Sequence, residues 1–130
     1  IEDLLVWMQK HEMDYTNTFR ELSSNTIPTG AQYYTNSFRS WWKRWQERLN
    51  ANSKPLKSSL CLMRANNPEI IPRNHKVEEV LSAAEAQSDF SKLHALLEAL
   101  SDPYNHKEQL SEFQKPPKPE ERVLQTFCGT

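Results

Sequence analysis

Glycine is almost missing from this sequence, which has only Gly30 and Gly129 among its 130 residues. Loops that cradle phosphate groups need clustered glycines, because the backbone must turn tightly and approach the phosphate closely. The chain has no such cluster. The sequence therefore excludes a P-loop, a dinucleotide-binding fingerprint and the glycine loop of a protein kinase.

Excess charge, long apolar runs and cysteine are scarce as well. The 16 Lys and Arg residues balance 17 Asp and Glu residues, for a formal net charge of -1. This balance disfavours binding to nucleic acid or to an anionic membrane through overall basic charge. No apolar run approaches the ~20 residues of a membrane-spanning helix, and no signal peptide opens the chain. Two cysteines, Cys61 and Cys128, make neither a disulfide framework nor a zinc cluster. We therefore expect a cytoplasmic protein with free thiols.

The apolar residues that are present follow helical spacing over most of the chain. The stripes that we expect to face inward are Ile1, Leu4, Leu5 and Met8; Tyr15, Phe19 and Leu22; Phe38, Trp41, Trp42, Trp45 and Leu49; Leu56, Leu60 and Met63; Val77, Val80, Leu81 and Ala84; and Phe90, Leu93, Leu97 and Leu100. No strand-like alternation of useful length occurs. The sequence predicts an all-α fold, an irregular bundle of about five to six short helices. Because the first stripe begins at the first residue, we expect a piece of a longer protein.

Polar and proline residues mark the expected boundaries. Asp14 and Asp89 are suited to cap the helices that follow them, and residues 66–74 contain two prolines and favour a turn. We expect one modest core and hence a single helical domain over residues 1–106. Residues 107–130 are expected to form an extended, proline-rich tail.

A basic, tryptophan-rich segment is the most prominent local feature. Residues 39–57 carry six basic side chains and one acidic side chain. The aromatics could stack on nucleic-acid bases while the cations contact phosphates. However, Trp41, Trp45 and Leu49 recur at four-residue spacing, as a core stripe does, and the cations fall largely at other helical angles. This separation favours a structural role for the tryptophans, with a protein-binding surface as the next interpretation.

Other constellations carry little chemistry. His94 and Glu98 share a helix face and His75 precedes Glu78 closely, but neither arrangement contains the paired histidines of a common zinc motif. His94 lies at the edge of an apolar stripe and is expected to be a core-edge residue. No serine lies in a nucleophile elbow. We therefore predict no catalytic and no metal-binding residue in this chain. The Pro116 to Pro119 segment matches the P-x-x-P pattern of SH3 ligands. Such matches are common by chance, and we expect a stiff strap that carries the tail across a surface.

Several segments resemble, in order and spacing, the C-terminal region of a known family. These segments are residues 14–20, 63–68, 71–79, 89–91, 96–104 and 116–130, with an Asn-Pro and a Pro-Arg-Asn block as the most specific parts. The chain resembles the selenoprotein O / YdiU family of kinase-like protein adenylyltransferases. The resemblance implies a parent that transfers AMP from ATP to Ser, Thr or Tyr hydroxyls of proteins, with Mg or Mn. The ATP-binding and metal-binding motifs of that family lie in its N-terminal, kinase-like part, so no cofactor residue is expected here.

The resemblance also implies roles for two places in the chain. Family tails commonly end in cysteine or selenocysteine followed by two small residues, and Cys128 with Gly129 and Thr130 is similar, although the usual two serines are absent. In the family, this residue is implicated in a redox disulfide with the kinase-like core. Taken alone, a cysteine at this position is equally consistent with an inert thiol.

The Pro-Arg-Asn block is the second place. Arg73 and Asn74 could dock on the missing core, since a guanidinium and an amide bind backbone carbonyls and carboxylates well. The alternative is a simple turn in which Asn74 caps the next helix. Cys61, inside a predicted helix, is expected to pack internally.

Two functions remain for comparison with the structure. The first is the C-terminal helical region of a protein adenylyltransferase, with the N-terminal kinase-like part of the same protein as its partner and protein substrates for the parent. The second is a non-enzymatic helical module that binds protein or RNA through residues 39–57. A small free-standing hydrolase is a distant third. The first function predicts an exposed apolar surface where the missing core would pack.

Overall fold

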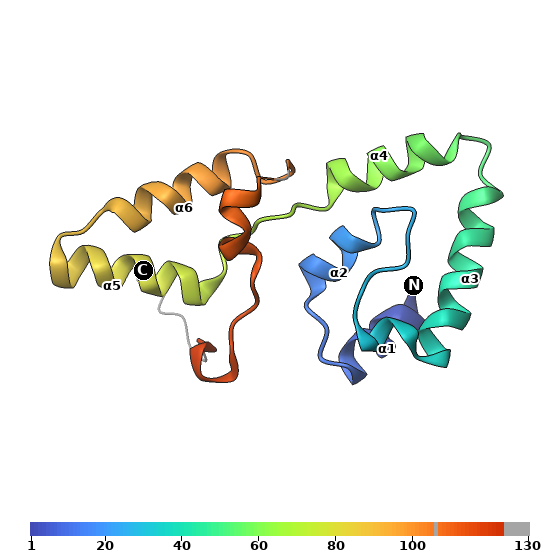
Figure 1. Cartoon of the computed structure of the whole chain (residues 1–130), viewed down its shortest axis with the longest axis horizontal. Helices are drawn as coiled ribbons and strands as arrows, with labels where there is room; N and C mark the ends of the chain where they lie inside the picture. Colours follow the sequence, from blue (N-terminus) through green and yellow to red (C-terminus); the bar gives the residue numbers. More distant parts are fainter. Residues whose placement is uncertain (106, 124–130) are drawn as a thin grey trace. The chain divides into compact units, whose positions relative to one another are not determined.

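The computed structural model describes residues 1–105 and 107–123, and within them the chain is built from helices and connecting segments without a strand. The helices are α1 (Glu2–Lys10), α2 (Tyr15–Glu21), η1 (Ala31–Tyr34), α3 (Asn36–Asn50), α4 (Leu56–Asn66), α5 (Asn74–Gln87), α6 (Ser91–Ser101), η2 (Glu108–Gln114) and η3 (Pro119–Glu121), where η denotes a 3-10 helix. The all-α class is confirmed (Figure 1), and with the 3-10 helices the count slightly exceeds the expected five to six.

The chain divides into two compact units, Ile1–Pro68 and Glu69–Thr130, which we call the N-terminal and the C-terminal unit. This boundary falls inside residues 66–74, where the sequence predicted a turn. The division of the chain at residue 106, which separates a helical domain from a tail, stays a prediction.

The N-terminal unit has an aromatic core. Phe38 is 0% exposed, and its ring centroid lies 4.7 Å from that of Trp7 and 4.9 Å from that of Tyr33. The buried cluster comprises Leu4, Trp7, Met8, Leu22, Tyr33 and Phe38. Trp41 and Trp42 pack against this cluster while partly exposed. All four tryptophans of the chain belong to this unit, so its packing depends largely on large rings.

Polar contacts join α2 to the end of α4. The Asp14 side chain caps α2 by accepting a hydrogen bond from the Asn17 amide at 2.9 Å, as the sequence predicted. At the other end of α2, the Arg20 guanidinium donates to the carbonyl oxygens of Arg64 and Asn67, both at 3.1 Å. These carbonyls belong to the C-terminal end of α4, whose last carbonyl groups lack helical donors. Arg20 therefore satisfies α4 and holds α2 against it.

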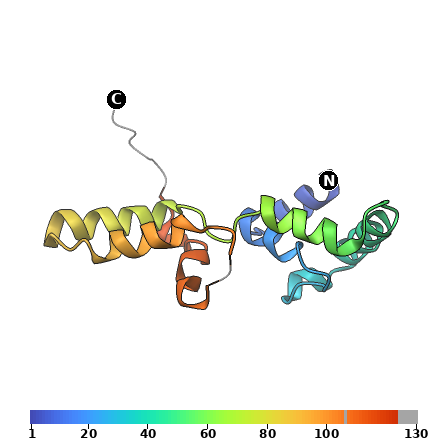
Figure 2. The same ribbon diagram turned by 90° about the horizontal axis from the view of Figure 1, so that it is seen from above.

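The C-terminal unit is a helical hairpin closed by a short 3-10 helix. Helices α5 and α6 lie side by side in both views (Figures 1 and 2). The buried cluster comprises Ile70, Val80, Leu96, Ala99, Leu110 and Phe113. The last two of these come from η2, which packs on α6. The amides of Glu69 and Ile70 donate to the Pro103 carbonyl at 2.7 and 3.2 Å, which fixes the start of the unit to the end of α6.

Several predicted inward positions are wrong. On α6 the buried residues are Leu96 and Ala99, whereas Phe90 and Leu97 are 51% and 55% exposed. Leu81 is likewise 49% exposed. The apolar residues of α6 form two stripes that differ by one residue, and the stripe with Leu96 and Ala99 is the buried one. Periodicity alone does not choose between such stripes.

Similar corrections apply elsewhere. Ile1, Leu5 and Tyr15 are exposed rather than inward, and Trp7 takes the buried position on α1 that the predicted stripe omitted. Cys61 is exposed and does not pack internally. These positions lie on short helices that bury only a narrow face.

The proline-rich segment partly follows the sequence prediction. Lys115 and Lys118 have φ and ψ values of -65° and 129°, and of -66° and 162°, which are close to polyproline II. The preceding stretch differs from expectation, because Leu110 and Phe113 are buried in η2. Their three-residue separation matches one turn of a 3-10 helix. Residues Glu108–Gln114 therefore form a 3-10 helix that packs on the unit, where an extended tail was expected.

Candidate functional site

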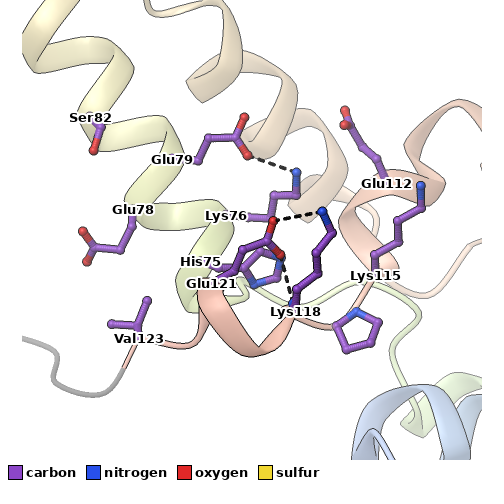
Figure 3. Close-up of a pocket in the computed structure, with 11 residues that line it drawn as sticks. His75, Lys76, Glu78, Glu79, Ser82, Glu112, Lys115, Lys118, Glu121 and Val123 are labelled. Atoms are coloured by element: carbon purple, nitrogen blue, oxygen red, sulfur yellow. Dashed lines mark hydrogen bonds and ion pairs between the residues drawn. The ribbon is translucent and has the colours of Figure 1, made fainter.

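The Pro-Arg-Asn block and residues 115–123 line two adjoining hollows of the C-terminal unit. Residues 115–123 include the Pro116 to Pro119 segment, and from here on we call the whole stretch the strap. The larger one, the charged hollow, has a volume of about 710 Å³ and is lined by His75, Lys76, Glu78, Glu79, Ser82, Glu112, Lys115, Pro116, Lys118, Glu121 and Val123 (Figure 3). The smaller one, the proline hollow, has a volume of about 460 Å³ and is lined by Ile71, Pro72, Arg73, Asn74, His75, Pro117, Glu121, Arg122 and Val123. His75, Glu121 and Val123 belong to both.

The start of α5 places the Pro-Arg-Asn block at this site. Arg73 is the N-cap residue, and its carbonyl accepts the amide hydrogens of Lys76 and Val77 at 2.9 and 3.0 Å. Arg73 is only 7% exposed, so most of its side chain lies inside the unit. Asn74 is the first helical residue and makes no side-chain cap, so its predicted capping role is wrong. Asn74 is exposed at the rim of the proline hollow.

Short-range ion pairs organise the charged hollow. Glu79 accepts hydrogen bonds from Lys92 on α6 at 2.6 Å and from Lys76 at 3.0 Å. Hydrogen bonds from Lys92 and then from Lys76 hold the pKa of Glu79 below its ordinary value of 4.5. In the strap, the Lys118 amide donates to Glu121 at 2.9 Å, which lowers the pKa of the Glu121 carboxyl. Figure 3 shows these carboxylates directed at their lysine partners.

His75 lies between these groups. Burial is the main cause that lowers its pKa, and the nearby Lys76 and Arg73 charges act in the same direction. Glu121 and Glu79 oppose the shift. His75 is therefore mostly neutral near pH 7, because its pKa is already below the ordinary value of 6.5.

The charged hollow is lined by both basic and acidic side chains. The lining contains four basic side chains, His75, Lys76, Lys115 and Lys118, and four carboxylates, Glu78, Glu79, Glu112 and Glu121. Two of the lysines form ion pairs, Lys76 with Glu79 and Lys118 with Glu121. No group of three or more His, Cys, Asp or Glu residues in the described part of the chain could hold a metal ion. Ser82, the only hydroxyl in the lining, has no hydrogen-bonded base among the described residues. The site therefore offers paired charges and no activated nucleophile.

The structure places the other predicted residues as follows. His94 is exposed on α6 rather than at the edge of the core. His75, Glu78 and Glu79 lie in one hollow, as their spacing suggested, but without forming a metal site. Cys128 lies outside the described residues. Sequence reasoning missed the lysines and Glu121 of the strap, although Lys118 and Glu121 have the three-residue spacing of a capping box and Pro119 occupies the first helical position between them.

The basic segment of α3 has the mixed character that its sequence suggested. Phe38 and Leu49 are buried, Trp41, Trp42 and Trp45 are partly buried, and Arg39, Lys43, Arg44 and Arg48 are exposed. The Arg39 guanidinium lies 5.4 Å from the Tyr34 ring centroid, and Arg44 pairs with Asp3 of α1. The tryptophans therefore contribute to the core, and the cations lie on the solvent side.

The described residues form two helical units, and ion pairs lie at the charged hollow of the second. Among those residues, no helix has both the length and the apolar character needed to cross a membrane. The family model described as "Protein adenylyltransferase SelO" matches residues 1–101. The chain belongs to this family, and the resemblance stated from its sequence is confirmed.

Curated relatives agree with this assignment. The chain is similar to the Protein nucleotidyltransferase YdiU of Nitrosococcus oceani, with 56% identity over 130 residues that are 100% of this chain and 26% of that protein. It is also similar to the protein of the same name from Alcanivorax borkumensis, with 52% identity over 100% of this chain and 27% of that protein. The protein of that name from Syntrophotalea carbinolica is 48% identical over 100% of this chain and 26% of that protein. The chain therefore spans about a quarter of the length of the relatives that it matches.

Proposed function

We propose that this chain is the C-terminal helical region of a protein adenylyltransferase that transfers AMP from ATP to Ser, Thr or Tyr hydroxyls of other proteins. In this proposal the chain supports the catalytic part and contributes no reacting group. Its membership of the SelO family carries the proposal, together with its share of 26% of a relative's length. Three quarters of such a protein remain to hold the kinase-like machinery.

The exposed apolar side chains argue that this chain packs against the rest of the protein. Many large apolar side chains in both units are well exposed, among them Ile1 (79%), Val6 (65%), Leu62 (61%) and Leu97 (55%). Burying such side chains is favourable at about 25 cal/mol per Å² of apolar surface. Contact with the rest of the protein would cover part of this surface, as the first function predicted.

ATP and Mg or Mn belong to the remaining part of the parent in this proposal. The described residues do not fit either group, since they contain no metal-ligand cluster and two of the three lysines of the charged hollow, Lys76 and Lys118, are paired with carboxylates. The sequence also lacks the clustered glycines of a phosphate loop. We therefore derive no step of AMP transfer through this chain.

The tail cysteine supplies the regulatory part of the proposal. Cys128 would form a disulfide with a cysteine of the kinase-like part, and the two thiols would lose two protons and two electrons to glutathione disulfide as oxidant. In the full-length protein, Cys128→Ser should abolish a reducible cross-linked peptide in mass spectrometry after non-reducing digestion. The same peptide map in the Cys61→Ser control should keep it. A reducible pair that persists in Cys128→Ser would contradict this role.

AMP transfer itself tests the main proposal. The full-length protein should incorporate labelled AMP from ATP into protein in the presence of Mg²⁺ or Mn²⁺, whereas the isolated chain should incorporate none. Truncation of the full-length protein before Ile1 should reduce labelling by about 100-fold, since a displacement of ~1 Å at the reacting groups costs that much. Undiminished labelling by the truncated protein would contradict the supporting role. Labelling by the isolated chain would overturn the assignment of chemistry to the remaining part.

A further inference from the structure

A third hollow, in the N-terminal unit, is separate from the two described above. It lies between the start of α1 and one flank of α3, with a volume of about 280 Å³. We call it the indole hollow, and it is lined by Ile1, Asp3, Trp41, Arg44, Trp45 and Arg48. Its floor contains two stacked indoles, because the rings of Trp41 and Trp45 have centroids 5.7 Å apart and planes inclined by only 14°.

The indole hollow combines an apolar floor with a positive rim. Ile1 is 79% exposed at its edge, and both tryptophans remain partly exposed. Two guanidinium groups, Arg44 and Arg48, stand four residues apart on the same side of α3, and Asp3 is the one acidic group in the lining. Asp3 pairs with Arg44, whose hydrogen bond lowers the pKa of Asp3 and keeps it anionic. Arg48 is exposed and has no acidic partner within the described residues.

This balance defines the chemistry of a suitable partner. One carboxylate against two guanidinium groups leaves a net positive charge at the rim, and Arg48 is the group left to bind an incoming anion. A guanidinium binds a carboxylate through parallel hydrogen bonds. The floor, in turn, favours a large apolar side chain. The matching ligand is therefore an apolar residue with an Asp or Glu beside it.

The volume and the ring contacts distinguish this partner from other ligands. The hollow is smaller than the ~300–1,000 Å³ typical of small-molecule pockets, so it suits one anchoring side chain. Base stacking would require a free indole face, but the Trp41 ring already contacts both Trp45 and Phe38, whose centroid is 5.6 Å away. These contacts favour a protein segment over RNA.

We propose that the indole hollow binds a segment of the remaining three quarters of the same protein, in which a large apolar side chain enters the hollow and an adjacent carboxylate pairs with Arg48. This inference rests on the proposed function, because it names where the supporting region meets its partner. The occupant follows from the chain's share of 26% of a relative's length, which leaves most of that protein available to cover the hollow. Charge complementarity also supports this occupant, because a carboxylate on the docked segment would pair with the Arg48 guanidinium.

Photo-crosslinking in the full-length protein tests the contact directly. Arg48 is replaced by p-benzoylphenylalanine, and Lys43 is replaced in a matched control, since Lys43 is exposed on α3 but does not line the hollow. After illumination and digestion, position 48 should cross-link to a peptide from outside the present 130 residues that contains an acidic residue beside an apolar one. Position 43 should yield that product at a level lower by about tenfold or more. Cross-links from position 48 that reach only this chain, or that reach co-purified RNA, overturn the inference.

Charge reversal supplies a second measurement that does not depend on the cross-linker. In the full-length protein, Arg48→Glu should accelerate hydrogen exchange in the docked peptide by about tenfold, as expected for the loss of one favourable charged contact. Arg48→Lys should largely restore protection, because the charge is kept. Equal exchange in all three proteins overturns the inference.

These results separate the two proposals. If truncation before Ile1 abolishes AMP labelling but position 48 gives no external cross-link, the docking site is wrong and the proposed function stands. If position 48 cross-links as expected but the full-length protein labels no protein with AMP, the proposed function is wrong and the interface stands.

Discussion

At the scale of single residues, Asp14 holds the first turn of α2. Its side chain accepts the Asn17 amide hydrogen at 2.9 Å, while its carbonyl accepts both the amide and the hydroxyl of Thr18. The sequence predicted this cap because an acidic residue precedes a helical stripe. The carbonyl contacts belong to the backbone and survive substitution, whereas a substitution by alanine removes the side-chain bond to the Asn17 amide.

We expect Asp14→Ala to lower the free energy of unfolding of the N-terminal unit by about 1 kcal/mol, because one amide at the start of α2 loses its acceptor. Asp14→Asn keeps a capping oxygen and should remain within about 0.5 kcal/mol of the original protein. Urea unfolding followed by tryptophan fluorescence measures this, since all four tryptophans lie in this unit. Equal losses in both variants would show that the cap is not the cause.

Glu79 gives the C-terminal unit a defined dependence on pH. Its pKa in the folded state is held below 4.5 by the Lys92 and Lys76 hydrogen bonds. Between the two pKa values the unfolded chain binds more protons than the folded one, so stability rises with pH there. The stabilisation is therefore complete above about pH 4.5 and is lost as the pH falls through the lowered value.

Glu79→Gln should remove this part of the acid sensitivity and should cost about 0.5 kcal/mol at neutral pH, as is typical of exposed ion pairs. The Ala99 methyl resonance, followed in urea at a series of pH values, reports the unfolding of this unit. Glu85→Gln is the control, because Glu85 is exposed on the same helix and has no ion pair among the described residues. An unchanged acid profile in Glu79→Gln would contradict the assignment.

At the scale of the element, α5 ends in a strained conformation. Ser88, its C-cap, has φ 51° and ψ 28°, which is the left-handed region that suits glycine. This residue lets the chain reverse into α6. The amide of the next residue, Asp89, donates to the Ala83 carbonyl at 3.3 Å, which holds the reversal in place.

Ser88→Gly should therefore raise the free energy of unfolding of the C-terminal unit by about 1 kcal/mol, since glycine has no Cβ to resist this conformation. The matched control is Ser82→Gly in the exposed middle of α5, which should lower it by about 0.5–1 kcal/mol. Opposite signs for the same chemical change, measured by thermal unfolding, are the expected result. Destabilisation by both substitutions would argue against strain at Ser88.

The same scale shows how far sequence patterns predicted the helices. The spacing of apolar residues located α3 and α5 well, because each has one broad apolar face flanked by strongly polar residues. On α6, Leu93, Leu96, Leu97 and Leu100 allow two stripes, and tertiary contacts with α5 and η2 selected the one containing Leu96. The 3-10 helix η2 was missed because its apolar residues are few and its period is three rather than 3.6.

At the scale of the whole molecule, the described residues form two cores rather than the single one that the composition suggested. Aromatic rings dominate the first and aliphatic side chains the second. Composition cannot reveal such a division, since both cores draw on one total of apolar residues. The boundary between Pro68 and Glu69 follows only from the structure, in which Phe38 belongs to one buried cluster and Val80 to another.

Two cores predict two separable unfolding transitions. Phe38→Ala removes a ring that is 0% exposed and should destabilise the N-terminal unit by about 3–5 kcal/mol. The loss should appear in tryptophan fluorescence, while hydrogen exchange of the α5 and α6 amides stays unchanged. The control Ser40→Ala, at an exposed position on α3, should remain within about 0.5 kcal/mol. A parallel loss of protection in α5 and α6 would show that the two cores unfold together.

The candidate site was only partly accessible from sequence. The Pro-Arg-Asn block identified the beginning of α5, but its spacing could not show that Arg73 is buried while Asn74 is exposed. The strap was expected to be stiff, yet its return to His75 depends on η2, which no pattern indicated. The indole hollow was missed because helical angles within α3 do not show that α1 closes one side of it.

Because the strap lies against the start of α5, the position of Val123 limits where Cys128 can lie. Val123 lines the proline hollow together with His75, and Cys128 is the fifth residue after it along the sequence. Five further residues extend at most ~18 Å, and disulfide partners have Cα atoms within ~7 Å of each other. A cysteine of the parent protein can therefore pair with Cys128 only if its Cα atom lies within ~25 Å of that of Val123. The candidate cysteines can be listed by measuring that one distance in a structure of the parent protein.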